Sequence, residues 1–180
     1  MVQADLYRKY FQHQCIEHPL LAEAEDGKVF ETVSVEEALG DLRSKVQEKG
    51  FIFRLIDYTY QVQGNGAGDN QKIVNGGFLI AKHYSTRTIG KQSLYDAQDQ
   101  SEEVVDNLIE KMIGDSIDGH PLFYHSLNTA EKIFVQPVEN VGDNGYAGWI
   151  CTFYFNNHFR ICPESPKTAW GDGGKTPHEL

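Results

Sequence analysis

The chain has 180 residues, of which 40% are hydrophobic and 12% aromatic, so it is long enough and apolar enough for one folded domain. Its 26 acidic residues outnumber 16 basic ones and give a net charge of -10, which argues against a general nucleic-acid binder, because phosphate contacts need clustered Lys and Arg. No apolar run approaches the roughly 20 residues of a membrane span, and the first residues lack a secretory pattern. We therefore expect a soluble cytoplasmic protein without membrane contact.

The first part of the chain is predicted to contain two helices and one short strand. Apolar residues recur at helical spacing over residues 3–18 and form one stripe. Residues 28–33 predict a short strand. A second helix is expected to begin at Ser34, because Glu37 completes a capping box with it, and to end before Gly50.

Two strand-like runs, residues 51–62 and 72–84, are rich in β-branched and aromatic residues and predict a long hairpin. The connection over residues 63–71 is expected to be flexible. Its glycines do not predict a phosphate-binding loop, because such a loop lies between a strand and the start of a helix. The alternating glycines of this connection are Gly64, Gly66 and Gly68.

A long amphipathic helix is predicted over residues 93–118, followed by strands over 132–138 and 146–155. Residues 123–127 are a further candidate strand that the element order does not count. The order α-β-α-β-β-α-β-β predicts an α+β fold, with an antiparallel or mixed sheet and helices packed mainly on one face. We expect residues 1–162 to form this single domain. Residues 163–180, rich in Pro and Gly, are expected to form an extended arm.

No group of polar residues predicts catalysis or a cofactor. Two sets have suitable side chains for a metal site or a Cys-His dyad, but their spacing is not specific. They are His13, Glu17, Cys15 and His18 in the first helix, and His158 with Cys162 near the end of the last strand. Three cysteines without a CxxC spacing also argue against a disulfide framework. We therefore expect no cofactor, no metal and no enzymatic activity.

Aromatic residues are more numerous than one face of a small antiparallel sheet requires, which is typical of subunit interfaces. The alternative is that the predicted helices cover all of them. The residues that we expect at an oligomer or partner interface are Tyr58, Tyr60, Gly64, Gly66, Gly68, Phe159 and Trp170.

Four stretches carry a resemblance to a known family: residues 6–11, 76–80, 103–115 and 148–155. In pattern and element order they resemble phage tail-terminator and head–tail joining (neck) proteins, and they are also similar to small proteins of phage-like gene clusters of Bacteroidetes. The resemblance covers about half of the chain and implies a small α/β protein that forms a ring, often hexameric, at the head-proximal end of the tail tube. It implies no catalytic residues.

This resemblance implies a virion structural protein whose partners are its own copies, the tail tube and neck proteins. DNA would pass through the acidic ring without specific binding. We expect the arm, residues 163–180, to cross to an adjacent protomer. Two other classes stay open: a small α+β enzyme or ligand-binding domain with a site near the 62–71 loop, and an acidic adaptor or inhibitor of a mobile element.

Overall fold

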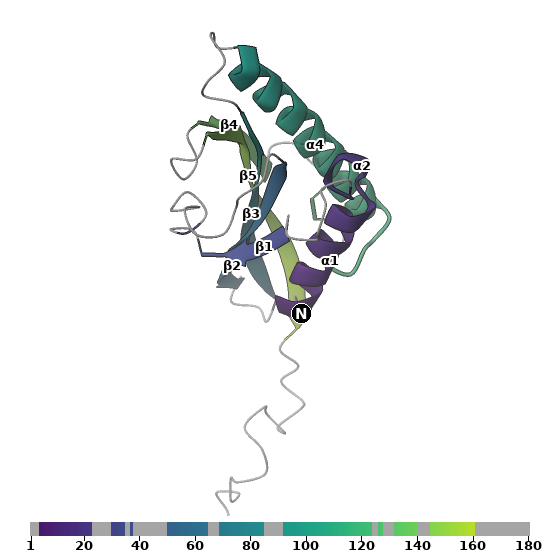
Figure 1. Ribbon diagram of the computed structural model, residues 1–180. Helices are drawn as coiled ribbons and strands as arrows, with labels where there is room; N and C mark the ends of the chain where they lie inside the picture. Colours follow the sequence, from purple (N-terminus) through teal and green to yellow (C-terminus); the bar gives the residue numbers. More distant parts are fainter. Residues whose placement is uncertain are drawn as a thin grey trace, which may run out of the picture.

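The computed structural model describes residues 4–22, 30–34, 37, 50–64, 69–84, 92–123, 126–127, 132–139 and 145–160. They form an α+β fold in which α1, α2 and α4 lie on one side of a five-stranded sheet (Figure 1). The predicted fold class is therefore confirmed. The helices are α1 (Ala4–Glu17), α2 (Pro19–Ala22) and α4 (Gln92–Ile117). The strands are β1 (Phe30–Val33), β2 (Phe51–Gly64), β3 (Asp69–His83), β4 (Ile133–Val138) and β5 (Tyr146–Arg160).

The sheet is mixed, in the order β1-β2-β3-β5-β4. The pairs β2–β3, β3–β5 and β5–β4 are antiparallel, whereas β1 runs parallel to β2. The three long strands β2, β3 and β5 form the centre, and β4 lies at an edge, where Pro137 removes one backbone donor.

The two longer helices bury the side chains that face the sheet. In α1 these are Tyr7, Tyr10, Phe11, Gln14 and Cys15, as the apolar spacing predicts. In α4 the buried positions are Ala97, Ser101, Val104, Val105, Leu108, Met112 and Ser116. At the end of α4, Ser116 is buried, whereas the apolar residue Ile117 is 59% exposed.

Aromatic rings fill the space between the helices and the sheet. The ring of Phe11 in α1 lies 5.7 Å from those of Phe78 in β3 and Phe153 in β5, and Phe53 in β2 lies 5.6 Å from Phe78. All four side chains are buried. Edge-to-face and tilted rings of this kind contribute packing beyond their area alone, so α1 is held against the middle of the sheet.

A β-bulge changes which residues of β2 face the helices. The register shifts between Ile56, which pairs with Gly77, and Thr59, which pairs with Asn75. Before the bulge, odd-numbered residues such as Phe53 lie on the face of the sheet that carries α1. After the bulge, even-numbered residues such as Tyr60 lie on that face, because Tyr60 pairs with the core residue Val74. The extra residue of a bulge reverses the alternation of a strand.

Two sequence predictions were wrong. The connection predicted over residues 63–71 is shorter, because ladder pairing continues to Gly64 opposite Asn70. The strand predicted over residues 123–127 is not formed among its described residues: Phe123 closes a turn, and the Leu127 N–H donates to the hydroxyl of Ser116 at 2.9 Å. Tertiary packing of Phe123 and Leu127 in the core explains their apolar character without a strand.

The predicted capping box is present. The Ser34 N–H donates to the Glu37 carboxylate at 3.0 Å, and the Glu37 N–H donates to the Ser34 hydroxyl at 3.3 Å. Glu37 is helical, whereas the rest of the predicted helix lies outside the described residues. The arm, residues 163–180, lies outside them as well.

Candidate functional site

The far half of β2 exposes apolar side chains on the face of the sheet that carries α1. Tyr60 is 55% exposed and Val62 is 56% exposed, although the alternation of the strand puts both on the face that carries the core. We call Tyr60, Val62 and Lys72 the hairpin patch. An exposed tyrosine and valine side by side on a strand are typical of a contact surface rather than of a solvated strand.

Lys72 gives this patch a fixed positive charge. The residue pairs with Val62 across the β2–β3 ladder, and its Nζ lies 3.6 Å from the ring centroid of Tyr60 and 5.7 Å from that of Tyr58. A cation over an aromatic face is attracted by the ring quadrupole. Partial burial lowers the pKa of Lys72 from its usual value. The patch therefore combines apolar area with one preorganised ammonium group.

The inner border of the patch is attached to the core. The ring of Tyr58 lies 5.2 Å from that of Tyr7, edge to face, and Arg8 forms an ion pair with Asp57 at 3.5 Å. These contacts join the start of α1 to the bulge. The patch begins beside the first turns of α1, next to the part of the sheet that this helix covers. Its position is therefore set by the packed part of the fold.

The predicted interface residues fall in different places. Tyr58, Tyr60 and Gly64 lie along β2, with Tyr58 half-buried and the other two exposed. Phe159 in β5 pairs with Asn70 of β3, which in turn pairs with Gly64, so the ladder brings these positions together at one end of the sheet. The remaining predicted residues, Gly66, Gly68 and Trp170, lie outside the described residues.

Sequence reasoning missed a second exposed apolar surface, on the edge strand β4. Phe134 is 56% exposed and Val135 is 37% exposed; as neighbours in the strand they lie on opposite faces of the sheet, with Val135 on the helix side, where its partner Cys151 lies. β4 pairs with β5 on one side, and in the part of the chain that the structure describes no strand pairs with its other side. The apolar run of residues 133–135, followed by a proline that favours an edge strand, was the signal for this surface.

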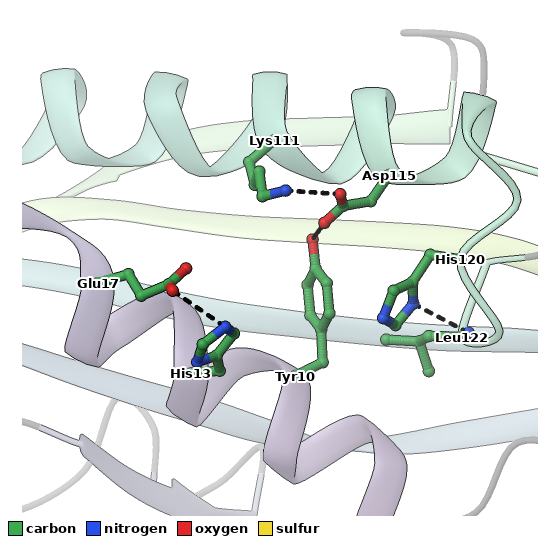
Figure 2. A network of polar contacts seen from close by, with 7 residues as sticks. All are labelled: Tyr10, His13, Glu17, Lys111, Asp115, His120 and Leu122. Carbon is green, nitrogen blue, oxygen red and sulfur yellow. Dashed lines mark hydrogen bonds and ion pairs between the residues drawn. The ribbon is translucent and has the colours of Figure 1, made fainter.

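A polar network joins α1 to α4 (Figure 2). The Tyr10 hydroxyl donates to the Asp115 carboxylate at 2.8 Å, and Lys111 Nζ contacts the other carboxylate oxygen at 2.6 Å. Burial, together with Asp115, raises the pKa of Tyr10 above its usual value, so the phenol stays protonated as a donor. This network fixes two helices against each other, and a strongly protonated phenol is a poor base or nucleophile.

The histidines near this network are held in local contacts. His13 Nε2 contacts the Glu17 carboxylate at 3.1 Å, within one helix. His120 Nδ1 accepts a hydrogen bond from the Leu122 N–H at 3.2 Å, and its ring packs against Tyr10 at 5.0 Å. Within the described ranges, no group of three or more His, Cys, Asp or Glu side chains is placed to hold a metal ion.

The two described cysteines are buried. Desolvation raises the pKa of Cys15 to about 11 and that of Cys151 to about 12. Because the thiolate is the reactive form, neither thiol is suited to nucleophilic catalysis at neutral pH. Cys162 of the candidate dyad lies outside the described residues, and of His158 only its backbone pairing with Gln71 is described.

A small pocket of about 180 Å³ opens at the start of α4. Its lining residues are Lys82, His83, Ser93, Asp96, Ala97 and Gln100. Lys82 is already engaged, because its Nζ donates to the Gln100 side chain and lies 4.8 Å from the Phe51 ring centroid. Ligand pockets usually have about 300–1,000 Å³, so this one is a weaker candidate than the exposed apolar surfaces.

No protein-family model matches this chain, and no curated protein is significantly similar to it. Among the described residues, no helix combines the length and apolarity that crossing a bilayer requires.

Proposed function

We propose that this protein is a structural assembly protein of a phage tail or tail-like particle, which works as a homo-oligomeric ring at the neck, where it caps the tail tube. The observation that carries the proposal is a pair of exposed apolar surfaces on different parts of one sheet: the hairpin patch and the edge strand β4 with Phe134 and Val135. The predicted resemblance to tail-terminator proteins supports the same assignment.

Two unlike surfaces favour a head-to-tail contact. A two-fold dimer uses one self-complementary surface, whereas a ring uses different surfaces on the two sides of each copy. The sheet order places β4 at an edge and separates it from β2 by two strands, so one protomer can use both surfaces at once. The unpaired side of β4 also offers backbone groups for strand addition.

The charge of the chain supports passage of DNA rather than its binding. The described part of α4 has seven acidic residues against one basic residue, Lys111. A surface of this sign repels phosphates, so a ring that presents it to a channel lets DNA pass without adhesion. The tail tube and neck proteins are the partners that this proposal requires.

The proposal is tested by changing β4 in the full chain. We expect Phe134→Ser together with Val135→Ser to remove rings from electron micrographs and to lower the average mass in solution, while the thermal unfolding temperature changes little. The matched control is Tyr95→Ser in α4, an aromatic residue that is 48% exposed and belongs to neither strand. Rings that form equally well in the double variant contradict the role of this strand.

A further inference from the structure

β5 ends at the end of the sheet that carries the hairpin patch. Arg160, the last residue of β5, pairs with Asp69, the first residue of β3, at the end of the sheet where the patch lies. β5 therefore ends at the same end of the sheet as Tyr60 and Val62, two strands away from β2, and residues 161–180 follow it in the sequence. We propose that the hairpin patch of each protomer receives residues 161–180 of a neighbouring copy, with Trp170 packed on Tyr60 and Val62.

The chemistry of the segment fits the patch. Trp170 is the largest apolar side chain in residues 161–180, and a buried tryptophan is a frequent anchor of protein interfaces. Asp172 follows two residues later, on the same side of an extended chain. When Trp170 covers Tyr60, the Asp172 carboxylate comes near Lys72, whose Nζ lies over the same ring. The patch thus offers an apolar platform and one complementary charge.

The length of the segment is sufficient. Twenty extended residues span up to about 66–72 Å, and a domain of this size is about 40 Å across. In a ring, symmetry places the hairpin ends of all protomers at the same rim, so a segment that leaves one hairpin end reaches the next patch along that rim. In the single chain, Tyr60 and Val62 remain more than half exposed, which leaves them for a second copy.

This inference rests on the proposed self-assembly and adds the contact that holds neighbours together. Its test uses three full-length variants: Tyr60→Ser with Val62→Ser, Trp170→Ala, and the combination of both. Sedimentation equilibrium measures the dissociation constant of each one. We expect the patch change and the Trp170 change each to raise the dissociation constant about tenfold or more. We expect the combination to raise it no further, because each single change already removes the same contact.

A mixing experiment distinguishes exchange between copies from docking within one chain. The patch variant keeps an intact Trp170, and the Trp170→Ala variant keeps an intact patch. We expect their equimolar mixture to form a species of two protomers at concentrations where each alone is monomeric. If the segment folds back on its own patch, or does not use the patch, mixing gives no such species, and the inference is overturned.

The control is Thr59→Ala, an exposed position of the same strand on the opposite face, which we expect to leave the dissociation constant unchanged. Circular dichroism of every variant checks that the fold is intact. An oligomeric wild type whose patch and Trp170 variants assemble normally overturns this inference alone. A wild type that is monomeric at every concentration contradicts the proposed function as well, so the two failures are distinguishable.

Discussion

The backbone N–H of Gly77 donates a hydrogen bond to the hydroxyl of Tyr7 at 3.2 Å, across the register shift of the β2–β3 ladder. The same hydroxyl lies 3.1 Å from the Ile56 carbonyl oxygen, to which it donates. One α1 side chain therefore satisfies two backbone groups that the bulge removes from regular pairing. The bulge in turn puts Tyr60 and Val62 on the helix face, so this contact positions the hairpin patch.

Replacing Tyr7 with Phe is expected to lower the free energy of unfolding by about 1–3 kcal/mol, because a buried donor and a buried acceptor lose their partner. Urea denaturation measures this change. The control, Tyr95→Phe at an exposed position of α4, is expected to stay within about 0.5 kcal/mol of wild type. A Tyr7→Phe variant as stable as the control would show that the bulge does not need this hydroxyl.

Glycine at position 148 is required by close backbone packing. A Cβ added there would lie 2.1 Å from the Ile80 carbonyl oxygen and 2.6 Å from Ala81 Cα in the neighbouring strand. Because these atoms belong to the backbone, we expect Gly148→Ala to destabilise the fold by several kcal/mol or to prevent folding. Gly114→Ala is the matched control in α4: no atom lies within 4 Å, so it should stabilise the fold by about 0.5–1 kcal/mol. Thermal unfolding of both variants measures the difference, and a folded Gly148→Ala variant of normal stability contradicts this packing.

Because of His18, we expect the fold to lose stability at mildly acidic pH. Burial lowers the pKa of His18, and the nearby charge of Glu103 only partly offsets this effect. The unfolded chain therefore binds a proton more readily at this position, with a pKa of about 6.5, and the native state loses stability as the pH falls below that value. We expect His18→Gln to reduce the fall in melting temperature between pH 7.5 and 5.5. A His18→Gln variant whose melting temperature falls as much as that of wild type over this range would contradict the assignment.

Because of Tyr10, we expect the fold to lose stability at alkaline pH. Burial and the bond to Asp115 raise the pKa of Tyr10, so its contribution is present below the unfolded pKa of about 10 and is lost as the pH rises above that value. We expect Tyr10→Phe to cost about 1 kcal/mol at pH 7 and to lose less stability than wild type between pH 9 and 11. Parallel urea curves for the two proteins at pH 9 and 11 measure this, and identical losses contradict it.

The two described thiols are expected to resist labelling. Cys15 and Cys151 are buried and have raised pKa values, so an alkylating reagent at pH 7.5 should leave both unmodified in the native protein and modify both in urea. Peptide mass spectrometry assigns the label to each position. Rapid modification of Cys151 in the native state would show that the core between β5 and the helices opens.

The local patterns predicted most of the elements but not how they pair. Helical spacing identified α1 and α4, and the pair Ser34 and Glu37 identified a helix start, because these signals depend on neighbours in sequence. The parallel pairing of β1 with β2 and the bulge after Ile56 depend on contacts between distant segments. Neither has a signature within a single strand, so neither was predicted.

The candidate surfaces were predicted in part for the same reason. The excess of aromatic residues indicated that some face outward and drew attention to Tyr58 and Tyr60. Which of the two is exposed follows from the packing of Tyr58 against Tyr7 at the start of α1, a contact that no local pattern predicts. Phe134 was missed because the apolar run of residues 133–135 has the same pattern whether its members are buried or exposed.

The solution mass of the purified full chain, measured by light scattering over a range of protein and salt concentrations, tests self-assembly most directly. The proposed function predicts a mass that rises with concentration to a fixed multiple of the 20.4 kDa protomer, near six copies for a hexameric ring. It also predicts that salt weakens assembly only in part, because the hairpin patch and the β4 surface are mainly apolar. A mass that stays at one protomer under all conditions contradicts it.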